Sequence, residues 1–170
     1  MSKTLQIQVD PFLCASQERT ISGALHYPDL MIIQHDINPS SGPIEANLTF
    51  SKQGKFVVLT GRISANLVLQ CAACLESIDF IVDINVKLAV FDDESMLSVL
   101  PDDYEPCVFE GDRLMINEVV ESEVLLVLPD IPRHEVCSSA LPTSSTDKDF
   151  TLEPEQKKNP FEALESLKKH

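Results

Sequence analysis

Apolar and polar residues alternate on both sides of the turn Cys71-Ala72-Ala73-Cys74. A repeat of two residues is typical of a β-strand with one buried face, because successive side chains point to opposite sides of the strand. The pattern therefore predicts an antiparallel hairpin that carries Cys71 and Cys74 at its tip. The apolar positions are Ile63, Ala65, Leu67 and Leu69 before the turn, and Ile78, Phe80, Val82, Ile84, Val86, Leu88 and Val90 after it.

Further strands are predicted before this hairpin. Residues 44–50 alternate in the same way, residues 51–55 have the composition of a turn, and residues 56–59 are apolar enough to be buried on both faces. Gly61 is a candidate for a bulge or a bend in the strand that reaches the cysteines.

The N-terminal region is less regular. Residues 5–9 alternate as a short strand that Pro11 interrupts, residues 20–27 are a second candidate strand, and Pro28 opens a short helical turn through Ile33. Successive strands with short connections predict a mostly antiparallel β meander or a partly closed β-barrel.

One helix is predicted, from Glu118 to Leu128. Its apolar residues recur at helical spacing, Asn117 is a candidate N-cap, and Glu118 and Glu121 stand in the first turn, where carboxylates favour the helix dipole. Pro129 ends the run. A helix that covers one face of the sheet places the protein in the α+β class.

The sequence predicts a single β-rich domain over residues 1–130 and a tail of different composition. Residues 131–158 are rich in Pro, Ser and Thr and show no periodicity, which is typical of a linker. Residues 159–170 combine capping signals with apolar residues on one helical face, so they predict a short amphipathic helix that needs a surface to dock on. Docking within the chain, fraying and binding to a partner remain open for this segment.

Charge is concentrated in one region of the chain. The protein has 170 residues and a formal net charge of -14, and residues 92–123 contain eleven acidic residues and one basic residue, Arg113. Such a segment repels nucleic-acid phosphates and favours a basic protein, although it also fits a solvated surface. The candidate partner-binding residues are Asp92, Asp93, Glu94, Asp102, Asp103 and Glu105, together with Phe161, Leu164 and Leu167 of the terminal segment.

The five cysteines favour a reducing, cytoplasmic environment, because their odd number and irregular spacing do not suggest a disulfide framework. No apolar run is long enough to predict a membrane span. No phosphate-binding Gly loop, G-x-S-x-G or H-E-x-x-H motif occurs, so the sequence predicts no catalytic residues and no enzyme.

The C-x2-C turn is the strongest chemical signal. Two thiolates at this spacing chelate Zn²⁺ from a tight turn, and His134 and Cys137 are the candidates that complete a tetrahedral set, with Cys107 as a competitor. Redox chemistry is a second interpretation, although a redox C-x2-C opens a helix and the flanks here predict strands. The third interpretation, which we favour from the sequence, is structural and requires no cofactor: Cys71 and Cys74 cap a hairpin, and Cys14, Cys107 and Cys137 act as small apolar residues.

Several motifs together resemble the YceD-type large ribosomal RNA subunit accumulation proteins. The resemblance spans most of the chain and rests on Leu59-Thr60-Gly61, Leu69 to Cys74, Tyr104-Glu105-Pro106, Glu118 to Glu123 followed by Leu126 to Pro129, and the ending Asn159 to Lys168. It implies a cytoplasmic factor needed for large-subunit ribosomal RNA to be made, processed or kept stable, with no established enzymatic activity. Members of the family are often encoded beside a small ribosomal protein of the large subunit.

The same resemblance implies a second cysteine cluster, because many relatives carry C-x3-C-x3-C-x2-C after the region that matches Pro129. This sequence departs from that pattern and keeps Cys137, with His134 nearby. We therefore expect a non-catalytic ribosome-biogenesis factor that acts through a basic ribosomal protein or a pre-ribosomal particle and binds naked RNA weakly. The alternatives are a hydrolase or nuclease that acts on ribosomal RNA, or a zinc or redox thiol protein.

Overall fold

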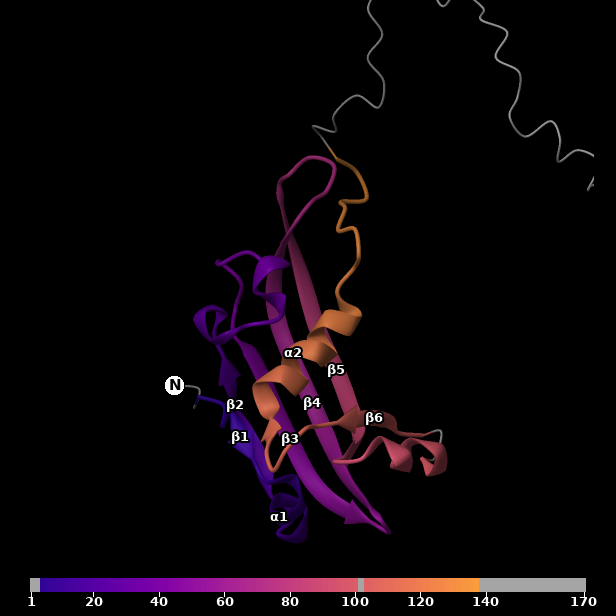
Figure 1. Cartoon of the computed structure of the whole chain (residues 1–170). Helices are drawn as coiled ribbons and strands as arrows, with labels where there is room; N and C mark the ends of the chain where they lie inside the picture. The colour runs from indigo at the N-terminus through magenta and orange to yellow at the C-terminus, as the bar shows by residue number, and fades with distance from the viewer. Residues whose placement is uncertain (1–3, 101–102, 138–170) are drawn as a thin grey trace, which may run out of the picture. The chain divides into compact units, whose positions relative to one another are not determined.

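The computed structural model describes residues 4–100 and 103–137, which fall within one compact unit. Figure 1 traces this unit from the N-terminal strand to the segment that follows the second helix. The predicted linker is described only up to Cys137. The predicted helix over residues 159–170, with Phe161, Leu164 and Leu167, lies outside the described residues.

The core of the unit is a five-stranded sheet with the strand order β2-β3-β4-β5-β6. The strands are β2 (Thr20–Leu25), β3 (Ile44–Gln53), β4 (Phe56–Gln70), β5 (Ser77–Phe91) and β6 (Glu105–Val108). Strands β2 to β5 pair antiparallel, which confirms the predicted α+β meander. The described strands form an open sheet, with β2 and β6 at its edges, rather than a closed barrel.

β6 was not among the strands predicted from the sequence, and it lies in the acidic region after Asp92. It pairs parallel to β5, with Pro106 opposite Ala89. Proline is tolerated there because β6 is an edge strand and the missing N–H does not interrupt a ladder on both sides. A 3-10 helix, η3 (Glu94–Val99), lies between β5 and β6.

The buried face of the sheet follows the predicted alternation. Ile63, Leu67 and Leu69 of β4 are buried, as are Val82, Val86 and Leu88 of β5, while Ile78, Phe80 and Ile84 pack partly buried against them. The polar residues Asp79, Asp83, Asn85 and Lys87 are exposed on the other face. The hydrophobic effect therefore fixes the register of this hairpin, because a one-residue slip would exchange the two faces.

Gly61 allows β3 and β4 to approach each other closely and does not form a bulge. The register of β3 against β4 runs without interruption, and Gly61 lies opposite Leu48. A Cβ atom at Gly61 would lie 2.0 Å from the carbonyl oxygen of Asn47. Only a residue without a side chain fits between these two strands.

The N-terminal region contains a helix that the sequence pattern did not predict, α1 (Pro11–Ser16). Asp10 caps it by accepting a hydrogen bond from the backbone N–H of Leu13, and Pro11 occupies its first turn, where a missing N–H costs nothing. The predicted strand over residues 5–9 is reduced to β1 (Gln8–Val9), which pairs with β7 (Leu114–Met115).

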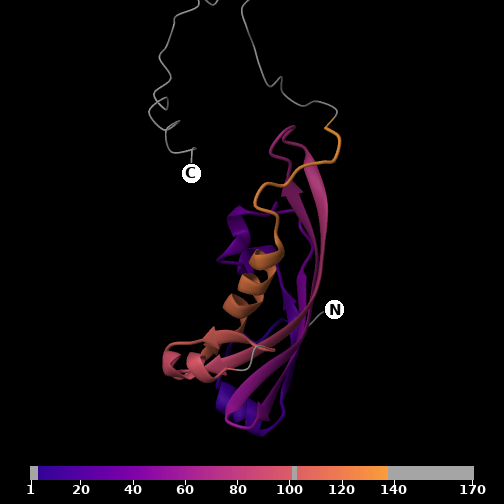
Figure 2. The same cartoon turned by 90° about the vertical axis from the view of Figure 1, so that its right-hand side faces the viewer.

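Short 3-10 helices follow β2. They are η1 (Tyr27–Asp29) and η2 (Ile33–His35), in agreement with the helical turn expected at Pro28. Together with the second helix, α2 (Ile116–Val127), they lie on one face of the sheet, its concave side in Figure 2.

The second helix, α2 (Ile116–Val127), is close to its predicted position. The predicted N-cap is wrong, because Met115 is the N-cap residue and Asn117 is buried inside the first turn. The helix packs on the sheet through Ile116, Val119, Val120 and Val124, all of them buried. Among the described residues no helix is long and apolar enough to cross a membrane.

Glu121 of α2 is fully buried. It therefore does not belong to the acidic surface, although it is one of the acidic residues of the region 92–123. Its Oε2 accepts hydrogen bonds from the backbone N–H groups of Met31 at 2.9 Å, Ile32 at 2.6 Å and Ile33 at 3.3 Å. Three donors on Oε2 offset part of the cost of burying the carboxylate, whose Oε1 has no hydrogen-bond partner among the described residues. They also tie α2 to the segment that enters η2.

Candidate metal centre

Cys71 and Cys74 lie at the tip of the β4–β5 hairpin, as predicted. Gln70 and Ser77 are the last paired residues, and the loop between them closes through hydrogen bonds from Cys71 N–H to the Glu76 carbonyl and from Leu75 N–H to the Cys71 carbonyl. Neither cysteine opens a helix. The structural condition for a thioredoxin-like redox pair is therefore absent at this turn.

The segment after α2 returns to this tip and brings two more donor residues beside it (Figure 1). The Pro132 carbonyl accepts a hydrogen bond of 2.8 Å from Ala72 N–H, and His134 Nε2 lies 3.2 Å from the Ser77 carbonyl oxygen. These two contacts align the chain so that His134 and Cys137 face the cysteines of the loop.

The four candidate ligand atoms form one compact cluster. The Sγ atoms of Cys71 and Cys137 are 3.6 Å apart, the Sγ of Cys74 is 3.3 Å from Nδ1 of His134, and all four atoms lie within 4.8 Å of one another. A tetrahedral Zn²⁺ with sulfur at about 2.3 Å and nitrogen at about 2.0 Å separates two sulfurs by about 3.8 Å and sulfur from nitrogen by about 3.5 Å. The donor set therefore fits a tetrahedral ion with small adjustments.

The surrounding hydrogen bonds orient the ligands. A carbonyl oxygen only accepts, so the contact with Ser77 places the imidazole proton of His134 on Nε2 and leaves the lone pair of Nδ1 facing the Cys74 thiol. The backbone N–H of Ala73 lies 3.5 Å from Cys71 Sγ and donates to it. Such outer contacts fix the tautomer and direction of metal ligands.

The two loop cysteines differ in acidity. Backbone N–H groups, that of Cys74 first, lower the pKa of the Cys71 thiol to about 5. The N–H of Glu76 acts in the same direction on Cys74, but burial and the neighbouring Cys71 and Cys137 outweigh it and raise the pKa of Cys74 to about 11. The thiolate, which is the metal-binding form, is thus favoured at Cys71 and disfavoured at Cys74.

The other cysteines stand apart from the cluster. Cys14 is buried in the hydrophobic core, and Cys107 lies on β6, where burial and the charge of Glu123 raise the pKa of its thiol to about 11. Cys107 therefore does not compete for the site at the hairpin tip.

Part of the predicted acidic surface lies within the described residues. Asp92, Asp93, Asp103 and Glu105 are exposed, whereas the side chain of Glu94 and residue Asp102 lie outside the described part of the chain. A groove between β6 and α2 was not predicted from the sequence, because the pattern does not reveal β6. Glu110, Glu118 and Glu123 are among the residues that line it.

These features define a class: a small α+β domain with a cluster of four Cys and His side chains whose geometry fits a tetrahedral metal ion. A family model described as "Large ribosomal RNA subunit accumulation protein YceD" matches residues 59–168, which include the whole cluster. A protein of that name from Haemophilus influenzae is 30% identical over 118 residues, or 67% of each chain. The chain belongs to the YceD family, which is named for a role in the accumulation of large-subunit ribosomal RNA. No solved structure matches it.

Proposed function

We propose that this protein is a non-catalytic cytoplasmic factor that supports the synthesis, processing or stability of large-subunit ribosomal RNA by binding a basic ribosomal protein or a pre-ribosomal particle. Membership of the YceD family carries the link to ribosomal RNA. The net charge of -14 supports a basic protein as the direct partner, because contact with phosphates relies on Lys and Arg.

The exposed carboxylates provide the surface for this partner. Asp92, Asp93, Asp103 and Glu105 are exposed on the segments around β6, and the nearby Lys87 is held over the ring of Tyr104, with Nζ at 4.1 Å from its centroid. Opposite charges on two proteins speed association and make it sensitive to salt.

The experiment is affinity capture of the tagged full-length protein from its own cells at low and high salt, with the bound proteins and RNA identified. We expect basic large-subunit proteins that dissociate at high salt, and a lower ratio of large- to small-subunit ribosomal RNA in cells that lack the protein. The proposal would be contradicted if the tagged protein still held ribosomal RNA after all other bound proteins had been removed, and if high salt did not release that RNA.

The cluster at the hairpin tip favours a second role, structural binding of Zn²⁺ by Cys71, Cys74, His134 and Cys137. The distances of 3.6 Å and 3.3 Å within the cluster carry this proposal. Four protein ligands fill a tetrahedral shell and leave no position for a substrate or a reactive water, which is typical of structural and not of catalytic zinc. The ion would fasten residues 131–137 to the hairpin.

Elemental analysis of the purified protein tests this role. We expect about one zinc per chain, lost in Cys71→Ser and kept in the matched variant Cys107→Ser, whose thiol lies outside the cluster. Equal metal content in both variants, or none in the unmodified protein after purification without chelators, would refute it.

Glu121 does not support the alternative of a hydrolase or nuclease. Glu121 is the fully buried carboxylate of the described residues, and one of its oxygens is already engaged by three backbone N–H groups. A general acid or base needs access to its substrate, which this position does not offer.

A further inference from the structure

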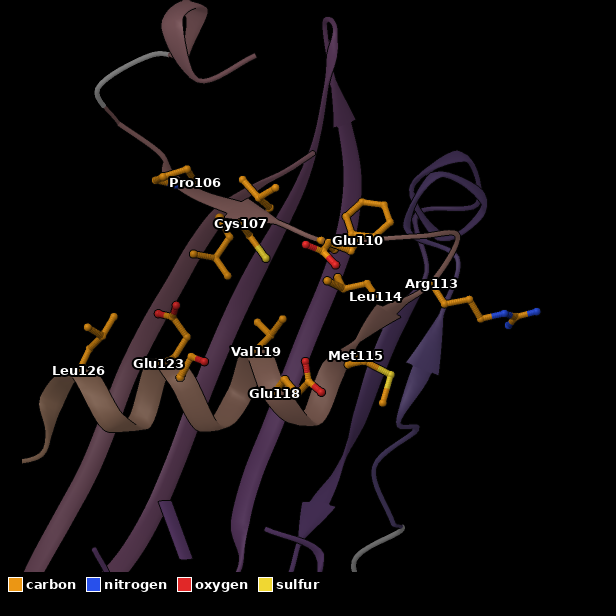
Figure 3. Close-up of a pocket in the computed structure, with 14 residues that line it drawn as sticks. Pro106, Cys107, Glu110, Arg113, Leu114, Met115, Glu118, Val119, Glu123 and Leu126 are labelled. Atoms are coloured by element: carbon orange, nitrogen blue, oxygen red, sulfur yellow. The ribbon is translucent and has the colours of Figure 1, made fainter. Parts of the chain in front are cut away.

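A groove of about 570 Å³ separates β6 and the following turn from the outer side of α2 (Figure 3). Its floor contains Cys107, Phe109, Leu114 and Val119, which are buried or partly buried apolar groups. The volume lies in the range that accepts a few side chains and not a whole folded element.

Carboxylates surround this apolar floor. Glu110 from the turn and Glu118 and Glu123 from α2 line the groove, and Figure 3 shows the one basic residue of the lining, Arg113, extending away from it. Among the described lining residues, no other cation balances these three charges. The groove therefore combines an apolar interior with a predominantly negative rim.

The surroundings of Glu123 disfavour the charged form of its carboxyl group. Glu123 is half-buried, and burial followed by the nearby charge of Glu105 raises the pKa of its carboxyl group. A cation beside Glu123 would relieve both effects, because it replaces lost solvation and offsets the repulsion from Glu105.

The groove continues towards the exposed acidic surface. Glu123 and Leu126 also line a second hollow of about 240 Å³, which includes Asp103, Glu105 and one cation, Lys87, whose Nζ lies over the ring of Tyr104. Leu126 lies at this junction with 75% of its surface exposed, and Val108 on the β6 side is 42% exposed. Apolar side chains at the mouth of an acidic groove offer contact area to a segment that carries both charge and an apolar residue.

We propose that this groove binds a short basic segment of the protein partner, with one apolar side chain between β6 and α2 and its Lys or Arg residues beside Glu118 and Glu123. The inference rests on the proposed function only in taking the partner to be a basic protein. Apolar contact supplies affinity and the paired charges supply orientation and rate of association. Glu110 at the turn is placed to receive a further cation at the end of the segment.

The test uses the full-length protein and two fluorescein-labelled peptides of ten residues. One peptide carries a central Leu flanked by Lys and Arg, and its control carries Ser in place of Leu. Fluorescence anisotropy should give a dissociation constant that rises about tenfold for Glu118→Gln combined with Glu123→Gln, since two partly screened pairs are lost. The control variant, Asp79→Asn combined with Asp130→Asn, removes the same charge from exposed positions that do not line the groove and should bind like the unmodified protein.

Three results would overturn the inference. Equal weakening by the groove and control variants would mean that net charge alone attracts the peptide. Equal binding of the Leu and Ser peptides would exclude the apolar anchor. Sedimentation that shows a dimer, broken by the groove variant, would assign the groove to a second copy of this chain.

Failure of this inference is separable from failure of the proposed function. If capture from cells yields a basic large-subunit protein equally with the groove variant and the unmodified protein, the groove is not the binding site and the proposed function stands. If capture yields no basic protein, the proposed function fails, and the peptide measurements alone decide on the groove.

Discussion

The two ends of the β4–β5 hairpin are held in place by different kinds of interaction. At one end, around Leu59 and Leu88, the strands are covered by α2 and belong to the main hydrophobic core. At the other end, the loop 71–76 is joined to the rest of the domain by a few hydrogen bonds and by a cluster of polar ligand groups. Burial of apolar area, which does not change with pH, stabilises the first end, whereas the second depends on the protonation of four side chains and, in our proposal, on their binding of Zn²⁺.

This difference implies two kinds of sensitivity. Substitutions at the core end should change the free energy of unfolding of the whole domain, while changes at the tip should open residues 131–137 and leave the sheet intact. The following predictions separate the two ends, beginning with the largest effect.

Gly61→Ala should lower the free energy of unfolding by about 4 kcal/mol, because the new Cβ would meet the Asn47 carbonyl oxygen at 2.0 Å and force β3 and β4 apart. Urea unfolding followed by circular dichroism measures this. The control is Gly54→Ala in the β3–β4 turn, where φ is +60° and no atom lies within 4 Å, so only about 1 kcal/mol should be lost. A similar loss in both variants would mean that the strands accommodate the methyl group.

Glu121→Ala should cost about 3 kcal/mol, because it leaves the N–H groups of Met31, Ile32 and Ile33 without their acceptor. Thermal unfolding would record the loss, and hydrogen exchange should become faster at these three amides. Glu118→Ala, on an exposed position of the same helix, should change stability by less than about 0.5 kcal/mol. Unchanged exchange at Met31 to Ile33 would refute the anchoring role of Glu121.

Removal of the proposed zinc ion with a chelator should act locally at the tip. We expect the amides of residues 131–137 and of Ala72 to exchange about 10- to 100-fold faster, which corresponds to about 1.4 to 2.7 kcal/mol, while the amides of β3 change little. Hydrogen exchange measured by mass spectrometry, with and without the chelator, tests this prediction. Cys107→Ser is the control, because it should keep the metal. Loss of protection throughout the sheet would show that both ends depend on the ion.

Glu123→Gln should have the smallest effect, a gain in stability of a few tenths of a kcal/mol at pH 7. The pKa of the Glu123 carboxyl group is raised in the folded state, so folding favours its protonated form. The contribution of Glu123 to the free energy of unfolding is therefore present at low pH and is lost as the pH rises through that raised pKa. The gain from the Gln variant should therefore disappear below the usual carboxyl range. Unfolding curves at pH 4 and pH 7 test the sign, and a variant that is less stable at pH 7 would contradict it.

The hairpin and the helix were accessible from the sequence because their signals are periodic. Alternation over β4 and β5 and helical spacing over α2 each repeat many times, so the pattern identifies the elements and their buried faces. The placement of Cys71 and Cys74 followed from the strands on either side. His134 and Cys137 were found as a second pair of suitable ligands, and the structure brings them to the first pair.

The errors have a common cause, which is that tertiary contacts assign roles that residue types do not reveal. Asn117 has the side chain of an N-cap, yet the chain enters α2 directly from β7 and buries it. Glu121 reads as surface charge until the segment at Met31 to Ile33 supplies its donors. β6 is four residues long, contains a proline and pairs parallel, so it has too little periodicity to be recognised, and the groove that it forms with α2 was missed with it.

The separation in sequence between the cluster's two halves has a consequence for the order of folding. Cys71 and Cys137 are 66 residues apart, and β5, β6 and α2 lie between them. During synthesis the first two ligands emerge long before the second two, and they become a four-ligand site only when every intervening element is in place. Tight capture of an ion by this chain would then be the last event of domain assembly, and an intact site would report that the sheet and its covering helix are already complete.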